Sequence, residues 1–298
     1  MRFVRYIAGG IAILLAVVIL LGAYVFVASE RRTNQTFSIA GATFAVAADS
    51  VALAHGAHLA ASRGCTDCHG ADLGGRVVVD DPALGKMVAS NLTRGSGGVG
   101  TQYVSTAEWD RAIRHGVSAA GRGLYMMPSE DYYHLSDADL GALIAHIQTV
   151  PDVDRELPRS HLGPVGRTLY VSGRLPIIAA EHLDHVAPRL AQPPAEITPE
   201  FGEYTAMLCI GCHGADLGGQ VYPLAPPGTP PASNLRAASG EGIATWTEDQ
   251  FITLMREGRR PNGEGVSEFM PISVTAALTD TEIRAIWAYL RTLEPAGR

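Results

Sequence analysis

The hydrophobic pattern begins with one long uncharged stretch. Residues Tyr6 to Ala28 contain no charged side chain, and their length exceeds the roughly 20 apolar residues that a helix needs to cross a bilayer. A cleaved signal peptide is the alternative, but its apolar part would be shorter and a small-x-small site would follow it closely. The nearest such site, Ala45-Val46-Ala47, lies well downstream. We therefore expect an uncleaved, single-pass membrane anchor over residues 1–32.

Beyond residue 48, apolar positions recur at helical spacing in two sets of segments that follow the same order. Each set has an early helix, ending at Gly64 in the first and starting at Thr198 and Pro199 in the second. Middle helices begin at Thr106 and Thr247, and last helices follow Leu135 and Leu278, so the sequence predicts an all-α fold. The expected buried positions are Trp109, Ile113, Leu140, Leu143 and Ile147 in the first set, and Phe251, Met255, Ile283, Ile286 and Leu290 in the second.

An internal repeat supports this division. The motif CTDCHGADLGG occupies 65–75 and CIGCHGADLGG occupies 209–219, and a Ser-Asn-Leu tripeptide follows each copy, at 90–92 and 233–235. We expect one domain at 49–151 and a second at 198–298. A tether or added strand would cover 33–48, and a proline-rich linker that wraps both domains would cover 152–197.

The four cysteines of the chain all lie in these two motifs. In each, a C-x-x-C pair is followed at once by a histidine, which is the pattern of covalent haem c attachment. A four-cysteine zinc site or two disulfides are the alternatives. A zinc site leaves the histidines unexplained, and the loop between the pairs is far longer than in zinc ribbons. The expected attachment residues are Cys65, Cys68, Cys209 and Cys212, with His69 and His213 as iron ligands.

A second pair of iron ligands is expected at Met127 and Met270. Each is followed by proline, 58 and 57 residues after the motif histidine, and a thioether raises the potential of an electron-transfer haem. Met126 lacks the proline and would face the other way on an extended segment. His115, His134 and His146 are further alternatives in the first domain.

With these motifs the chain resembles the class I cytochromes c over residues 49–298. The resemblance implies two tandem class I domains, two covalently bound haem c groups and His/Met ligation of each iron. It also implies that Pro82 and Pro226, thirteen residues after the histidines, accept a hydrogen bond from the ligand imidazoles.

The resemblance implies an electron carrier rather than an enzyme, similar to the cytochrome subunits of periplasmic sugar or alcohol dehydrogenases. Its partners would be a dehydrogenase, an oxidase or another cytochrome. A dihaem peroxidase and a relay subunit of a dehydrogenase complex are the alternatives. Because haem c is attached outside the cytoplasmic membrane in bacteria, we expect the domains in the periplasm; the charges flanking the anchor are nearly balanced.

The net charge outside the anchor bears on the class of partner. Without the anchor and its flanks, 19 basic and 29 acidic residues remain. This acidity makes nucleic acid an unsuitable partner and would favour a redox protein with a basic docking patch.

Overall fold

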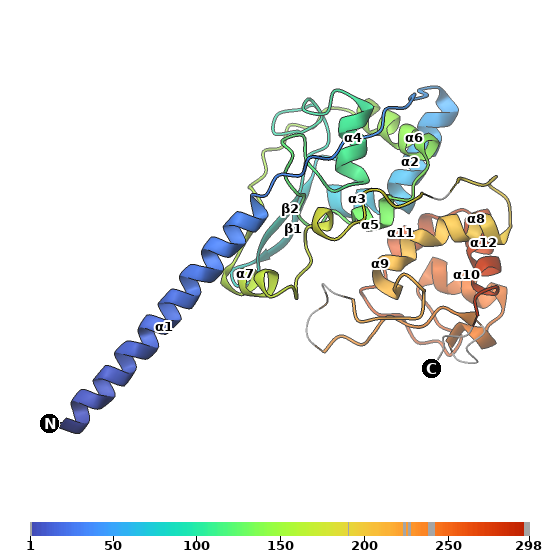
Figure 1. The fold of residues 1–298 in the computed structure, drawn as a ribbon. Helices are drawn as coiled ribbons and strands as arrows, with labels where there is room; N and C mark the ends of the chain where they lie inside the picture. The colour runs from blue at the N-terminus through green and yellow to red at the C-terminus, as the bar shows by residue number, and fades with distance from the viewer. Residues whose placement is uncertain (1, 190, 223–224, 226–227, 238–241, 295–298) are drawn as a thin grey trace.

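A long helix projects from a body of two helical domains (Figure 1). The computed structural model describes residues 2–189, 191–222, 225, 228–237 and 242–294. Helix α1, Arg2–Thr33, is one continuous helix. Its segment Phe3–Thr33 has a mean hydropathy of 3.0 in its most apolar part, and that part is not buried against the rest of the molecule. The helix is therefore long and apolar enough to cross a membrane, as a single-pass anchor requires.

The first domain contains five helices among the described residues. They are α2 (Ser50–Ser62), α3 (Cys65–His69), α4 (Thr106–Ile113), α5 (Ser129–Tyr132) and α6 (Asp137–Thr149). Asp49 caps α2 and Ser136 caps α6, each by accepting backbone N–H groups of the first turn. Helix α2 crosses α6 at Gly56, where a Cβ atom would overlap the carbonyl group of Ala142. A larger residue at this position would force the two helices apart.

The second domain repeats this arrangement. Its elements are α8 (Pro199–Ala206), η2 (Met207–Cys209), α9 (Ile210–His213), η4 (Gly242–Thr245), α10 (Glu248–Glu257), α11 (Ile272–Ala277) and α12 (Asp280–Leu290). Thr198, Thr247 and Thr279 cap α8, α10 and α12, as expected. Helix α8 crosses α12 at Gly202, against the carbonyl group of Ala285. The helix crossing is thus the same in both domains.

The ten apolar positions expected to be buried are all buried. Those of α4 and α6 form one hydrophobic core with Leu59 and Tyr132. Those of α10 and α12 form the core of the second domain. One cap differs from expectation, because Ser105, not Thr106, caps α4 through a capping box with Glu108.

A small antiparallel sheet in the first domain was not predicted. Strands β1 (Arg76–Asp81) and β2 (Gly85–Ala89) form a hairpin, and β3 (His161–Leu162) adds to the outer side of β2. Because β3 comes from the expected linker, the sheet joins that linker to the first domain. The helical fold class holds for the rest of the chain.

The segments before and after the first domain both lie along it. Residues 35–48 contain no helix and run along the first domain, with Phe37 N–H donating to the Gly121 carbonyl at 2.8 Å and Ala42 N–H to the Asp110 carboxylate at 2.8 Å. In the expected linker, α7 (Pro164–Val171) packs against α1 and η1 (Ala179–Glu181) against α5. These three elements of the expected linker, β3, α7 and η1, thus follow the first domain and the anchor.

Candidate functional site

Each cysteine-histidine motif forms a single short helical turn. In the first domain Gly64 turns the chain with φ 76°, α3 follows, and Gly70 ends it with φ 82°. Positive φ angles of this kind are accessible to glycine without strain. Residues spaced i, i+3 and i+4 share one helical face, so the turn directs the side chains of Cys65, Cys68 and His69 to the same side. In the second domain Cys209 ends η2, and α9, which carries Cys212 and His213, ends at Gly214 with φ 86°.

The imidazoles are fixed by backbone carbonyl groups. His69 Nδ1 lies 2.7 Å from the Ser90 carbonyl oxygen, and His213 Nδ1 lies 2.7 Å from that of Ser233. A carbonyl oxygen can only accept, so Nδ1 carries the proton in both rings and Nε2 keeps its lone pair. Burial lowers the pKa of both imidazoles, which favours this neutral form.

These contacts correct the expected role of the prolines. Pro82 lies in the exposed turn between β1 and β2, and Ser90 supplies the carbonyl group that holds His69. Pro226 lies outside the described residues, and Ser233 holds His213. The repeated Ser-Asn-Leu tripeptide was the signal that could have identified both carbonyl groups.

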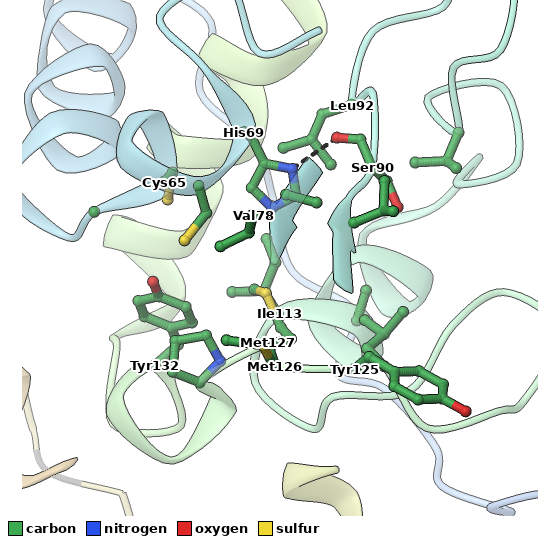
Figure 2. Close-up of a pocket in the computed structure, with 18 of the residues that line it drawn as sticks. Cys65, His69, Val78, Ser90, Leu92, Ile113, Tyr125, Met126, Met127 and Tyr132 are labelled. Carbon is green, nitrogen blue, oxygen red and sulfur yellow. Dashed lines mark hydrogen bonds between the residues drawn. The ribbon is translucent and has the colours of Figure 1, made fainter. Parts of the chain in front are cut away.

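An apolar cavity opens beside the first motif (Figure 2). It has a volume of about 210 Å³. Figure 2 shows His69 on one side and Met126 and Met127 on the other, with Cys65 at the edge between them. Most of the lining is apolar, from α4, α6, the β1–β2 hairpin and the segment that follows it: Val78, Met87, Val88, Leu92, Trp109, Ile113, Leu143 and Ile147.

The two adjacent methionines differ in environment. Met127 packs into the core of the first domain together with Cys65. Met126 has φ 55° and packs into a separate cluster with Tyr170 and Ile178 of the linker. In the second domain, Met270 packs into the core that contains Cys209. The Met-Pro methionine of each domain therefore shares a core with the attachment motif.

The residues fit a covalently bound haem. The donor set combines a neutral imidazole, a thioether and two free thiols at an apolar slot, which suits a flat, largely apolar macrocycle bound through axial ligands and thioether links. Burial raises the pKa of Cys65 and Cys209 to about 12, in keeping with these apolar surroundings. Within the described part of the chain, no three His, Cys, Asp or Glu side chains gather to hold a metal ion, so the two C-x-x-C pairs do not meet in a zinc site.

None of the three alternative histidines lines the cavity of the first domain. His115 Nδ1 lies 2.9 Å from Nδ1 of His185 in the linker, and its ring packs edge-on against Tyr133. Burial lowers the pKa of His134 and of His146.

The two motifs lie at a reciprocal interface between the domains. Helix α11, which follows the second Met-Pro pair, packs against α2, and Ser273 donates to the Asp67 carboxylate inside the first motif at 2.5 Å. Helix α5, which follows the first Met-Pro pair, packs against η2 and α9 of the second motif. Here the Asp131 carboxylate lies against Gly211. Each Met-Pro helix thus touches the attachment motif of the other domain or the helix that leads into it.

Two polar contacts across the interface are reciprocal in the same way. His58 of α2 bonds to Glu282 of α12 at 2.9 Å, and Tyr204 of α8 donates to Asp139 of α6 at 2.6 Å. Both acids occupy the third position of the last helix of their domain. The first helix of each domain therefore binds the start of the last helix of the other, as in a twofold arrangement.

Asp131 is an ionisable group at the centre of this interface. Burial, together with the neighbouring Glu130, raises its pKa to about 7, against a hydrogen bond from the Gly211 backbone. Its Oδ1 atom is buried without a hydrogen-bond partner. No motif or spacing in the sequence points to this group, because its neighbours come from both domains.

The comparison with protein families gives a match in each half of the chain. The cytochrome c family matches residues 53–151 and again residues 203–294. The two matches include the motif, the Met-Pro pair and the last helix of each domain. Together they cover more than half of the sequence.

Individual relatives are components of dehydrogenases. A nicotinate dehydrogenase subunit of Pseudomonas putida is 26% identical over 81% of this chain, which corresponds to 21% of that protein. The fructose dehydrogenase cytochrome subunit of Gluconobacter japonicus is 25% identical over 81% of the chain and 52% of its own length. The cytochrome c subunit of the quinone alcohol dehydrogenase of Gluconacetobacter polyoxogenes is 27% identical over 83% and 57%. The chain thus spans about a fifth of the first relative and somewhat more than half of the other two.

Proposed function

The chain belongs to the cytochrome c family, and on that premise we propose that it is a membrane-anchored dihaem electron carrier. It would pass single electrons between a periplasmic or membrane donor and a terminal acceptor. One observation carries this proposal: each half holds an imidazole with its Nδ1 proton fixed, beside a core that contains the Met-Pro sulfur. Two such sets support two haem groups.

The proposed haem-binding residues follow from this geometry. Cys65 and Cys68, and in the second domain Cys209 and Cys212, would form the thioether links. His69 and Met127 would be the axial ligands of one iron, and His213 and Met270 those of the other. When bound, haem iron supplies a reversible one-electron change.

The protein groups around each site would hold it rigid and dry. The carbonyl groups of Ser90 and Ser233 keep each imidazole in the tautomer that presents Nε2. The apolar lining by Trp109, Ile113 and their neighbours excludes water. If His69 and Met127 hold one iron, and His213 and Met270 the other, neither iron would keep a free position for a substrate, which supports a carrier rather than a peroxidase.

The reciprocal interface supports transfer of electrons between the two halves. The helix that follows each Met-Pro pair packs at the attachment motif of the other domain. The thioether side of one site would therefore lie close to the methionine loop of the other. The proposed domains, 49–151 and 198–298, would each hold one complete site on its side of this interface.

The partner that we propose is a dehydrogenase, with this chain as its cytochrome subunit. The support is that the relatives above are named as dehydrogenase subunits. The acidic surplus outside the anchor supports docking to a basic surface. Co-purification with a dehydrogenase from the native membrane would test this assignment, and a chain that purifies alone with full electron-carrier activity would contradict it.

The site itself is tested by counting haem and following sulfur ligation. We expect two haems per chain, and a near-infrared band of methionine ligation to ferric haem that falls by half in Met127→Leu and in Met270→Leu. Met126→Leu is the matched control and should keep the full band. A wild-type haem that lacks the band and reacts with peroxide would refute closed His/Met ligation and support the peroxidase alternative.

The proposed location is the cytoplasmic membrane, with the haem domains in the periplasm. Haem attachment outside the membrane and the apolar helix α1 support it. Protease added to spheroplasts should cleave the domains. Protection equal to that of a cytoplasmic marker would contradict this orientation.

A further inference from the structure

The end of α1 is bound tightly to the linker. Arg32 donates to both carboxylate oxygens of Glu181 at 2.8 Å and to the Tyr170 carbonyl at 2.9 Å. Its guanidinium also lies 4.3 Å from the centre of the Tyr170 ring. Since α1 runs unbroken to Thr33, these contacts fix the direction in which the first domain leaves the anchor.

Helix α7 meets α1 at the level where the apolar stretch ends. Arg167 lies 4.6 Å from the centre of the Phe26 ring and pairs with Glu30 at 2.7 Å. It also donates to the Ser29 hydroxyl at 2.7 Å. Phe26 is two residues before the end of the uncharged stretch, which is about 3 Å along a helix. If α1 spans a bilayer, α7 therefore lies at its surface.

The turn of the β1–β2 hairpin is held against the start of α7. Gly163 N–H donates to the Leu84 carbonyl and Val165 N–H to the Ala83 carbonyl, each at 2.9 Å. The side chains at this junction point away from the domain, with Leu84 39% and Val165 47% exposed. We call Pro82, Ala83, Leu84, Val165 and Leu169, the last one helical turn beyond Val165, the turn patch.

The turn patch faces the membrane side of the molecule. Figure 1 shows α7 and the lower end of the hairpin at the part of the first domain nearest the free length of α1, with α4 at the opposite end. The acidic groups of the turn are already bound, because Asp81 accepts the N–H groups of Ala83 and Leu84 and Asp80 pairs with Lys86. The turn patch would therefore bind a partner by burying apolar side chains and not by pairing charges.

We propose that the turn patch rests in the interfacial layer of the bilayer that α1 spans. The first domain would then keep a fixed distance from the bilayer and a fixed orientation, instead of moving freely about the end of α1. The inference rests on the proposed membrane anchoring. Because the patch is apolar, its contact with lipid should persist at high salt.

The test uses the full-length haem protein in nanodiscs of phosphatidylcholine and phosphatidylglycerol. Spin labels are placed at Leu84→Cys and Val165→Cys, and collision rates with oxygen and with a water-soluble nickel chelate are measured in the reduced protein. Val104→Cys, 85% exposed before α4, is the matched control in the same domain. Leu15→Cys reports on the anchor.

The labels at Leu84 and Val165 should collide with nickel at least about threefold less often than the label at Val104. Equal nickel collision at all three positions, with Leu15 still protected, would overturn the inference and leave the anchor intact. Nickel access at Leu15 as well would overturn both. Protection at Leu84 and Val165 that disappears in high salt would contradict the apolar basis of the contact.

Discussion

Replacing Glu282 with glutamine should weaken the docking of the two domains. The Glu282 carboxylate accepts from Thr279 N–H at 2.7 Å, bonds to His58 at 2.9 Å and lies 3.7 Å from Arg63. Although burial raises the pKa, the His58 hydrogen bond, the Arg63 charge and the Thr279 N–H together lower it from 4.5 to about 2. At about 1.4 kcal/mol per pKa unit, the ionised state stabilises the fold by up to about 3 kcal/mol.

Glutamine keeps the cap of α12 but removes the charge. Gln250 occupies the same position in the capping box of α10, so α12 should still start at Thr279. We expect Glu282→Gln to lower the free energy of unfolding at pH 7 by about 2 kcal/mol, because hydrogen bonds to a charged group become neutral ones. Urea denaturation of the full-length protein, followed by haem absorption, measures this loss.

Glu108→Gln is the matched control. Glu108 occupies the same cap position in α4, where it binds Ser105 and Val104 at the surface of the first domain. This variant should lose less than about 1 kcal/mol. The difference between the losses in Glu282→Gln and Glu108→Gln separates the contribution of the domain interface from that of the helix cap.

The pH dependence gives a second test. A carboxylate with a lowered folded pKa stabilises the protein fully above its unfolded pKa and loses this contribution as pH falls. For Glu282 the window is from 4.5 down to about 2. The difference between wild type and Glu282→Gln should therefore shrink across this range. A difference that is absent at pH 7, or that stays constant down to pH 2, would refute the reasoning.

Two further perturbations test the interface and the helix crossings. The pKa of Asp131 in the folded protein is raised from 3.8 to about 7. The free energy of unfolding of the wild type should therefore fall as pH rises between these values, because the fold disfavours the ionised carboxylate. Asp131→Asn should remove this decline in urea titrations at pH 5 and pH 8; a decline that persists in the variant would assign it to another group. Gly202→Ala should lower the unfolding free energy by about 2 kcal/mol, because its Cβ would overlap the Ala285 carbonyl. Gly265→Ala, in open space, should change the unfolding free energy by less than about 0.5 kcal/mol in the same urea measurements. Equal losses in both variants would contradict the packing argument.

The amino-acid sequence alone determined the features that depend on short spacing. The buried face of α12, with Ile283, Ile286 and Leu290, follows from the helical period. The caps at Thr198 and Thr279 follow from side chains that bond within the same turn. The motif of Cys65, Cys68 and His69 needs only one helical turn to bring its side chains together. These features were predictable because each is local.

Tertiary structure decided the features that join distant residues. The carbonyl group that holds His69 belongs to Ser90, not to Pro82, because the hairpin between them directs Pro82 outward. The third strand of the sheet forms only when residues 161–162 return to β2. The bond from His58 to Glu282 spans 224 positions, and no periodicity or propensity encodes such a pairing. It depends on how two packed domains fit together, and that fit is a property of their surfaces rather than of any segment.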